Sequence, residues 1–109
     1  MKSDIASIRR IFSTMERDGL DVSEPLQFGY FFFHSTAEPL LKVASWLADR
    51  DYTIADLSDR DDGTWVLNLS KVERHTPETL HQRNLAMNRL AEEFGVDDYD
   101  GWDVGEIEE

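Results

Sequence analysis

The stretch LQFGYFFFH, residues 26–34, decides the fold of this chain. Both of its alternating sets of side chains are apolar or aromatic, whereas a strand with one solvent face alternates apolar and polar residues. One set is Leu26, Phe28, Tyr30 and Phe32, and the other contains Phe31 and Phe33. The stretch therefore predicts an inner strand that is covered on both sides. We expect helices on one face, and an N-terminal helix or a second subunit on the other.

The segments around this strand have clear periods. Before it, apolar residues recur every three or four positions from Ile5 to Met15 and predict a helix over about residues 3–18. Asp62-Gly63 predicts a two-residue hairpin turn. The remaining pattern predicts helices over residues 35–50 and 77–94 and strands over residues 52–57, 64–72 and 99–104.

The predicted order of elements is one helix followed by β-α-β-β-α-β. Two split βαβ units of this kind form a ferredoxin-like sandwich, in which two helices cover one face of a four-stranded antiparallel sheet. The sequence thus predicts an α+β, ferredoxin-like fold with an additional N-terminal helix. The chain has 109 residues, the length of one domain. We expect a single domain over residues 1–109, with the sandwich over about residues 26–104.

The charge of the chain is concentrated in its second half. The sequence has 11 basic and 23 acidic residues, a net charge of -12. Residues 1–50 hold 6 basic and 7 acidic residues, residues 51–109 hold 5 and 16, and nine carboxylates follow Arg89. Such a charge repels phosphates, which argues against direct nucleic-acid binding, and it attracts basic partners. The alternative is that the acidity only maintains solubility.

The sequence lacks the features of membrane and disulfide-bonded proteins. It contains no cysteine, which rules out disulfides and thiolate metal sites. The N-terminus, MKSDIASIRRIF, has no apolar run of signal-peptide type, and no stretch reaches the roughly 20 apolar residues of a membrane span. We expect a cytoplasmic protein that does not bind membranes.

Residue types that carry catalysis or bind metals form no known pattern here. His34, His75 and His81 match no metal-ligand spacing, and we expect them at the surface or at element edges. The acidic loop 56–63 is not a calcium loop, since Leu69 stands where a bidentate glutamate is required. No glycine-rich phosphate loop and no serine–histidine motif occurs. We therefore predict no metal, no cofactor and no catalytic residue.

The sharpest local feature is an acidic turn that leads into YDGW, residues 99–102. Glycine inside a short edge strand indicates a bulge or a close backbone approach. Aromatic side chains beside a strand edge can anchor a protein partner, and carboxylates can steer it. The alternative is that the tryptophan only packs against the sheet. The candidate protein-binding residues are Asp97, Asp98, Tyr99, Asp100, Trp102 and Asp103.

The same segment is similar to a known family. FGV, residues 94–96, followed by YDGW, residues 99–102, resembles the C-terminal hallmark of the regulator of ribonuclease activity B family. The order of elements resembles that family as well. The resemblance implies a non-catalytic regulator that binds the endoribonuclease of the bacterial RNA degradosome and inhibits it through protein contacts, without holding RNA.

Three functional hypotheses follow. The first is a protein-binding regulator whose acidic surface binds an endoribonuclease with basic segments, as a monomer or as a homodimer through the open sheet face. The second is a small-ligand-binding or enzymatic ferredoxin-like domain, which requires a pocket with convergent polar groups such as His34, His75 and Tyr30. The third is an acidic nucleic-acid mimic, whose binding would collapse with salt and tolerate Trp102→Ala.

Overall fold

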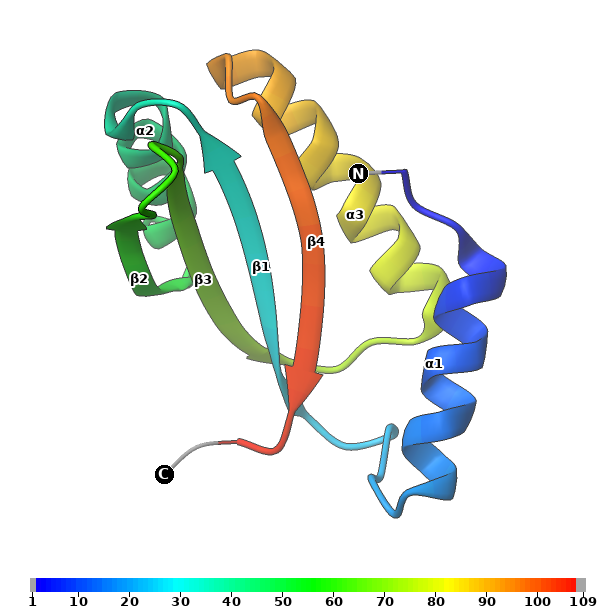
Figure 1. The fold of residues 1–109 in the computed structure, drawn as a ribbon. Helices are drawn as coiled ribbons and strands as arrows, with labels where there is room; N and C mark the ends of the chain where they lie inside the picture. Colours follow the sequence, from blue (N-terminus) through cyan, green and yellow to red (C-terminus); the bar gives the residue numbers. More distant parts are fainter. Residues whose placement is uncertain (1, 108–109) are drawn as a thin grey trace.

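The computed structural model describes residues 2–107, which form three helices and four strands in the predicted order (Figure 1). Glu108 and Glu109, the last two acidic residues, lie outside the described residues. The elements are α1 (Ile5–Arg17), β1 (Leu26–His34), α2 (Ala37–Ala48), β2 (Thr53–Asp59), β3 (Trp65–Glu73), α3 (Pro77–Phe94) and β4 (Asp98–Gly105).

The four strands form one antiparallel sheet in the order β2-β3-β1-β4. β1 pairs with β3 on one side and with β4 on the other, so LQFGYFFFH is an inner strand, as predicted. α2 and α3 lie on one face of the sheet (Figure 1). The expected α+β, ferredoxin-like fold with an additional N-terminal helix is confirmed, and β4 lies at an edge of the sheet.

The N-terminal helix does not cover the other face of the sheet, so of the two expected covers, this helix or a second subunit, the helix is excluded. α1 lies beside α3 (Figure 1). Its buried residues, Ile8, Phe12 and Met15, join the same core as α2 and α3. Ser3 Oγ lies 2.7 Å from His81 Nδ1, which ties the N-terminal segment to α3. The physical reason is that polar residues of β3 and β4 interrupt the apolar surface on the other face, whereas the helix-side core is continuous.

The register separates the side chains of β1 into two environments. Phe28, Tyr30 and Phe32 face the helices and are at most 1% exposed. Phe31 and Phe33 point to the other side and remain partly exposed. We call this second side the open face. Its aromatic residues account for the apolarity of both sides of LQFGYFFFH, although none of the helices within residues 2–107 packs on them.

Local sequence signals explain the bounds of α3. The Thr76 hydroxyl accepts a hydrogen bond from Thr79 N–H, which satisfies one of the free amides at the start of the helix. Pro77 occupies the first turn, where no amide hydrogen is needed. Gly95 ends the helix with φ 70°, a conformation that favours glycine.

The turn between β2 and β3 differs from the prediction of a two-residue hairpin. Arg60 N–H donates to Thr64 O at 2.7 Å, and Gly63 N–H donates to Arg60 O at 3.0 Å. Gly63 adopts φ 84°, but Asp62 does not have a positive φ. The connection is therefore a longer loop over residues 60–64, because only one of the two central residues takes the left-handed conformation that a two-residue turn requires.

Candidate functional site

The predicted binding segment follows α3 and forms β4, and strand alternation divides its residues between the two faces of the sheet. Tyr99 pairs with Phe32, is 1% exposed, and donates a hydrogen bond to Asn84 Oδ1 at 2.6 Å. Burial raises the pKa of the Tyr99 hydroxyl far above its ordinary value, so the hydroxyl stays protonated. Tyr99 is thus a residue of the core.

Trp102 also lies mainly on the helix side. It pairs with Tyr30, and its ring centroid is 6.4 Å from that of Phe28. Because β4 is an edge strand, the side chain packs against the border of the core and stays partly exposed. The packing alternative for this tryptophan therefore agrees with the structure.

Two carboxylates of β4 belong to the open face or its border. Asp98 pairs with Phe33 and Gly101 pairs with Phe31, so Asp100 is the additional residue of a β-bulge. The glycine in this strand predicted either a bulge or a close backbone approach, and the bulge is present. Gly101 adopts φ 140°, which side chains rarely allow. Asp100 is exposed at this bend.

Asp103 lies on the open face. It pairs with Gly29 of β1, and a Cβ atom at Gly29 would overlap its carboxylate oxygen. Glycine at this position therefore leaves the space that the carboxylate occupies. Asp97 precedes β4 in an exposed turn, where its N–H donates to His34 Nδ1 at 3.1 Å.

The structure adds two residues to this region that the functional prediction missed. Phe31 and Phe33 line a hollow of about 470 Å³ beside Asp100, and Trp102 borders it. The Arg60 guanidinium lies over the Phe33 ring, 4.7 Å from its centroid. We call Phe31, Phe33, Asp98, Asp100 and Asp103 the acidic aromatic surface.

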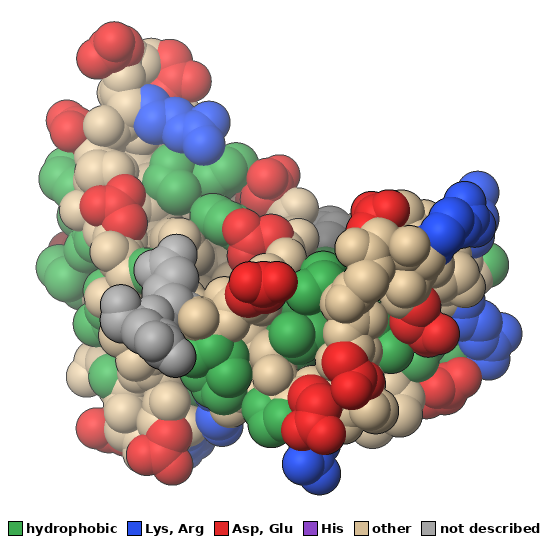
Figure 2. Space-filling model, turned by 90° about the horizontal axis from the view of Figure 1, so that it is seen from below, with side chains coloured by type: hydrophobic (Ala, Val, Ile, Leu, Met, Phe, Trp, Pro, Cys, Tyr) green, Lys and Arg blue, Asp and Glu red, His purple; other side chains and the backbone are tan. Residues whose placement is uncertain are grey.

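Acidic side chains occur beyond this surface as well. Figure 2 shows them spread over the face seen from below, with apolar patches between them. A partner could therefore not distinguish the acidic aromatic surface by charge alone. The aromatic pair beside the carboxylates is what distinguishes it.

Among the described residues, neither a metal-binding group of side chains nor a membrane-spanning helix is present. Within residues 2–107, no group of three or more histidine and acidic side chains is placed to hold a metal ion. In the same range, no helix has the length and apolar composition of a membrane span.

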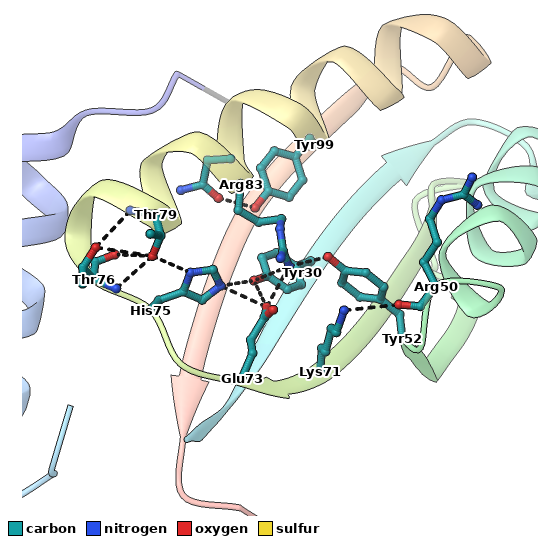
Figure 3. Close-up of polar contacts among 11 residues, drawn as sticks. Tyr30, Arg50, Tyr52, Lys71, Glu73, His75, Thr76, Thr79, Arg83 and Tyr99 are labelled. Carbon is teal, nitrogen blue, oxygen red and sulfur yellow. Dashed lines mark hydrogen bonds and ion pairs between the residues drawn. The ribbon is translucent and has the colours of Figure 1, made fainter. Parts of the chain in front are cut away.

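A buried polar cluster lies on the helix side, between β1, β3 and α3 (Figure 3). Its centre is Glu73 Oε2, which accepts hydrogen bonds from the Tyr30 hydroxyl at 2.8 Å and from Arg83 Nη1 at 2.7 Å. His75 Nε2 lies 3.0 Å from the same oxygen. Arg83 also donates to the Tyr52 hydroxyl. One carboxylate thus joins two strands to α3.

The cluster fixes the protonation states of its members. Burial raises the pKa of Glu73, but its three hydrogen-bond donors outweigh burial and bring the pKa to about 2. Burial raises the pKa of Tyr30 beyond its ordinary range and that of Tyr52 to about 12. Glu73 is therefore ionised and both tyrosines are protonated at neutral pH. The carboxylate and the guanidinium of the cluster therefore balance each other's charge inside the core. The hydrogen-bond donors and acceptors of the cluster bind one another.

The residues named for a small-ligand or enzymatic site do not all converge. The Tyr30 hydroxyl lies 3.4 Å from His75 Nε2, but His34 lies beside Asp97, away from the cluster. Of the two positions expected for the histidines, the surface or an element edge, His75 takes the edge between β3 and α3, where it is buried with 8% exposure. It is buried because the Phe28 ring packs against it with centroids 4.7 Å apart and because the cluster satisfies its nitrogens.

The fold and this site define the class: a ferredoxin-like α+β domain with an additional N-terminal helix and an uncovered sheet face. Its family is shown by sequence comparison, in which the family described as Regulator of ribonuclease activity B matches residues 6–104. The chain belongs to this family, which confirms the resemblance carried by residues 94–102. A comparison with curated proteins gave no match. The family description connects the chain to the regulation of ribonuclease activity.

Proposed function

We propose that this chain is a non-catalytic regulator that binds a cytoplasmic endoribonuclease through the acidic aromatic surface and inhibits it. The observation that carries the proposal is the partly exposed aromatic pair Phe31 and Phe33 beside the carboxylates of β4. Interface energy concentrates in aromatic and arginine residues. Carboxylates around them speed the approach of a basic partner and set its orientation.

The contact between Arg60 and Phe33 supports an arginine-rich segment as the bound element. Arg60 already stacks on the aromatic ring at 4.7 Å from its centroid, and the hollow beside it is also lined by Asp100 of β4. A guanidinium of a partner would meet the same chemistry at Phe31, an aromatic face and charged acceptors within one surface. Tyr99 and Trp102 contribute by holding β4 against the core.

The experiment compares two variants with equal net charge. Asp98→Asn/Asp100→Asn/Asp103→Asn removes three carboxylates from the acidic aromatic surface. The control variant removes three exposed carboxylates elsewhere, Glu16→Gln/Asp18→Asn/Glu38→Gln. Affinity for the purified degradosome endoribonuclease and inhibition of its RNA cleavage are measured at low and moderate salt. We expect the first variant to lose affinity at least about tenfold, the control less than about threefold.

The other outcomes decide between the alternatives. If the unmodified chain neither binds nor inhibits at either salt concentration, the proposal is wrong. If both variants lose the same affinity and binding disappears with salt, the chain acts as an acidic nucleic-acid mimic. If the open face instead joins two copies of the chain, Phe31→Ser will dissociate a dimer in sedimentation experiments and ribonuclease affinity will be unrelated to these residues.

A further inference from the structure

A pocket that the proposed function does not use lies between α2, the segment that follows α2, β3 and α3. Its volume is about 400 Å³. Four of the 11 basic residues of the chain line it, and Glu93 is the one acidic residue among those lining it. The basic residues are Arg50, Lys71, Arg83 and Arg89. In a chain with a net charge of -12, this local reversal of charge needs an explanation.

The lining of the pocket has two chemically different parts. Leu47, Met87 and Leu90 are at most 5% exposed and supply an apolar floor. Trp46 and Tyr52 add aromatic faces, and Trp46 is 38% exposed. A concave site with an apolar floor and a few convergent polar groups is the usual form of a small-molecule site.

The cations at the rim are held in place by the protein. Arg50 Nη1 donates to the Trp46 carbonyl at 2.8 Å, and its guanidinium stacks on the Trp46 ring at 3.5 Å from the centroid. Lys71 Nζ donates to the Arg50 carbonyl at 3.2 Å and lies 4.7 Å from the Tyr52 ring centroid. Figure 3 shows Arg50, Lys71 and Tyr52 meeting where β3 passes the end of α2. Ordered cations lose less conformational entropy when they bind an anion.

The charge of these cations is not neutralised within the described chain. Arg83 is paired with Glu73, whereas Arg50, Lys71 and Arg89 form no ion pair with any acidic residue between positions 2 and 107. Arg83 also donates to the Tyr52 hydroxyl, which fixes the position of the Tyr52 ring at the pocket. Three cations are thus available to a ligand.

We propose that this pocket binds a small amphipathic anion, with a carboxylate or phosphate on an aromatic or apolar body. The anionic group would lie between Arg50, Lys71 and Arg89, and the body would rest on Met87 and Leu90. The volume fits a small molecule rather than a polymer. The overall charge of -12 opposes the approach of a nucleic acid. The site is independent of ribonuclease binding.

The test uses the ¹⁵N-labelled chain and three probes of similar size: phenyl phosphate, benzoate and uncharged benzyl alcohol. We expect saturable shifts of the Trp46 indole N–H with at least one anion and at least tenfold weaker binding of benzyl alcohol. Tighter binding of phenyl phosphate would assign a phosphate monoester, and tighter binding of benzoate a carboxylate. The proposal is overturned if neither anion gives saturable shifts, or if benzyl alcohol binds as well as the anions.

Three variants locate the anionic group. Lys71→Gln and Arg89→Gln should each weaken anion binding about tenfold, the usual effect of removing a charged hydrogen-bond donor. Arg89 is the more exposed of the two side chains. Arg10→Gln, which changes an exposed cation on α1, should change the affinity less than twofold. If Arg10→Gln weakens binding as much as the other two, the attraction is nonspecific and the pocket is not the site.

Discussion

The two faces of the sheet receive alternate residues of β1, and these residues differ in burial. On the helix side, Phe28, Tyr30 and Phe32 are at most 1% exposed and hold the core together. On the open face, Phe31 and Phe33 contribute aromatic surface that remains partly exposed. The difference shows that neighbours in one strand can have different environments, and it agrees with the proposal that the partly exposed residues bind a partner while the buried ones stabilise the fold.

Neighbouring phenylalanines give the largest contrast between the two faces. Phe32→Ala should reduce the free energy of unfolding by about 3–5 kcal/mol, because it leaves a cavity in a core position that is 0% exposed. Phe33→Ala should cost about 1 kcal/mol, because this ring is already in contact with solvent. Urea unfolding at pH 7 measures both values. Similar losses for the two variants would contradict the division of the strand into a folding face and a binding face.

The polar cluster gives the helix side of the sheet a pH dependence. The pKa of Glu73 is about 2 in the folded chain, compared with an ordinary value of 4.5. A carboxyl group with a lowered pKa stabilises the fold above its unfolded pKa, and this contribution is lost as the pH falls through its folded pKa. Glu73 should therefore supply about 3 kcal/mol that disappears between about pH 4.5 and pH 2.

This prediction is measured as a difference between variants, since many other carboxylates titrate in the same range. Urea unfolding of the unmodified chain and of Glu73→Gln is compared between pH 7 and pH 2. The difference in unfolding free energy should be largest at pH 7 and shrink as the pH falls. Glu92→Gln, which changes an exposed glutamate, serves as the control. A difference that stays constant with pH would show that ionised Glu73 does not stabilise the cluster.

The strands and helices could be predicted from local patterns because each element carries its own signal. The apolarity of LQFGYFFFH indicated the inner strand, and Gly101 indicated an irregularity in β4. The position of α1 could not be predicted, because its apolar stripe fits any apolar surface. Which surface α1 covers depends on where polar side chains such as that of Asp103 lie. These positions are set only when the strands have paired in the folded sheet.

Only part of the candidate site could be predicted from local patterns. Asp98, Asp100 and Asp103 lie on or beside the open face, but alternation places Tyr99 in the core. The buried cluster was missed, since Glu73 and Arg83 are ten residues apart on different elements and form no motif. The sequence did carry one signal for the cluster. Every second residue of β3 faces the core, and counting on from the buried Leu69 places the acidic Glu73 on this side.

Gly29 lies close to the Asp103 carboxylate on the open face, and a substitution there should have a smaller effect on stability. Gly29→Ala should displace the Asp103 carboxylate and cost about 1 kcal/mol, the lower end for overpacking, because Asp103 is exposed and can rotate away. It should also weaken ribonuclease binding if Asp103 orients the partner. Gly105→Ala is the matched control, since nothing lies within 4 Å of its Cβ position. Equal effects of the two variants in urea unfolding would argue against the close approach.

Asp97 should give the smallest change in stability, because its apparent ion pair with His34 has the wrong hydrogen-bond geometry for a neutral ring. Asp97 Oδ2 lies 3.3 Å from His34 Nδ1, but that nitrogen accepts the Asp97 N–H at 3.1 Å. A nitrogen that accepts carries no proton to donate to the carboxylate. At pH 8, Asp97→Asn should therefore change the free energy of unfolding by less than about 0.5 kcal/mol.

The same variant locates the end of the binding surface. The Asp97 side chain is 66% exposed and lies just before β4, so its charge can steer a basic partner without being buried by it. Asp97→Asn should slow association modestly and leave dissociation unchanged in surface plasmon resonance with the ribonuclease. A faster dissociation would place Asp97 inside the contact. The turn would then belong to the acidic aromatic surface, and the two faces of the sheet would no longer describe the division between folding and binding residues.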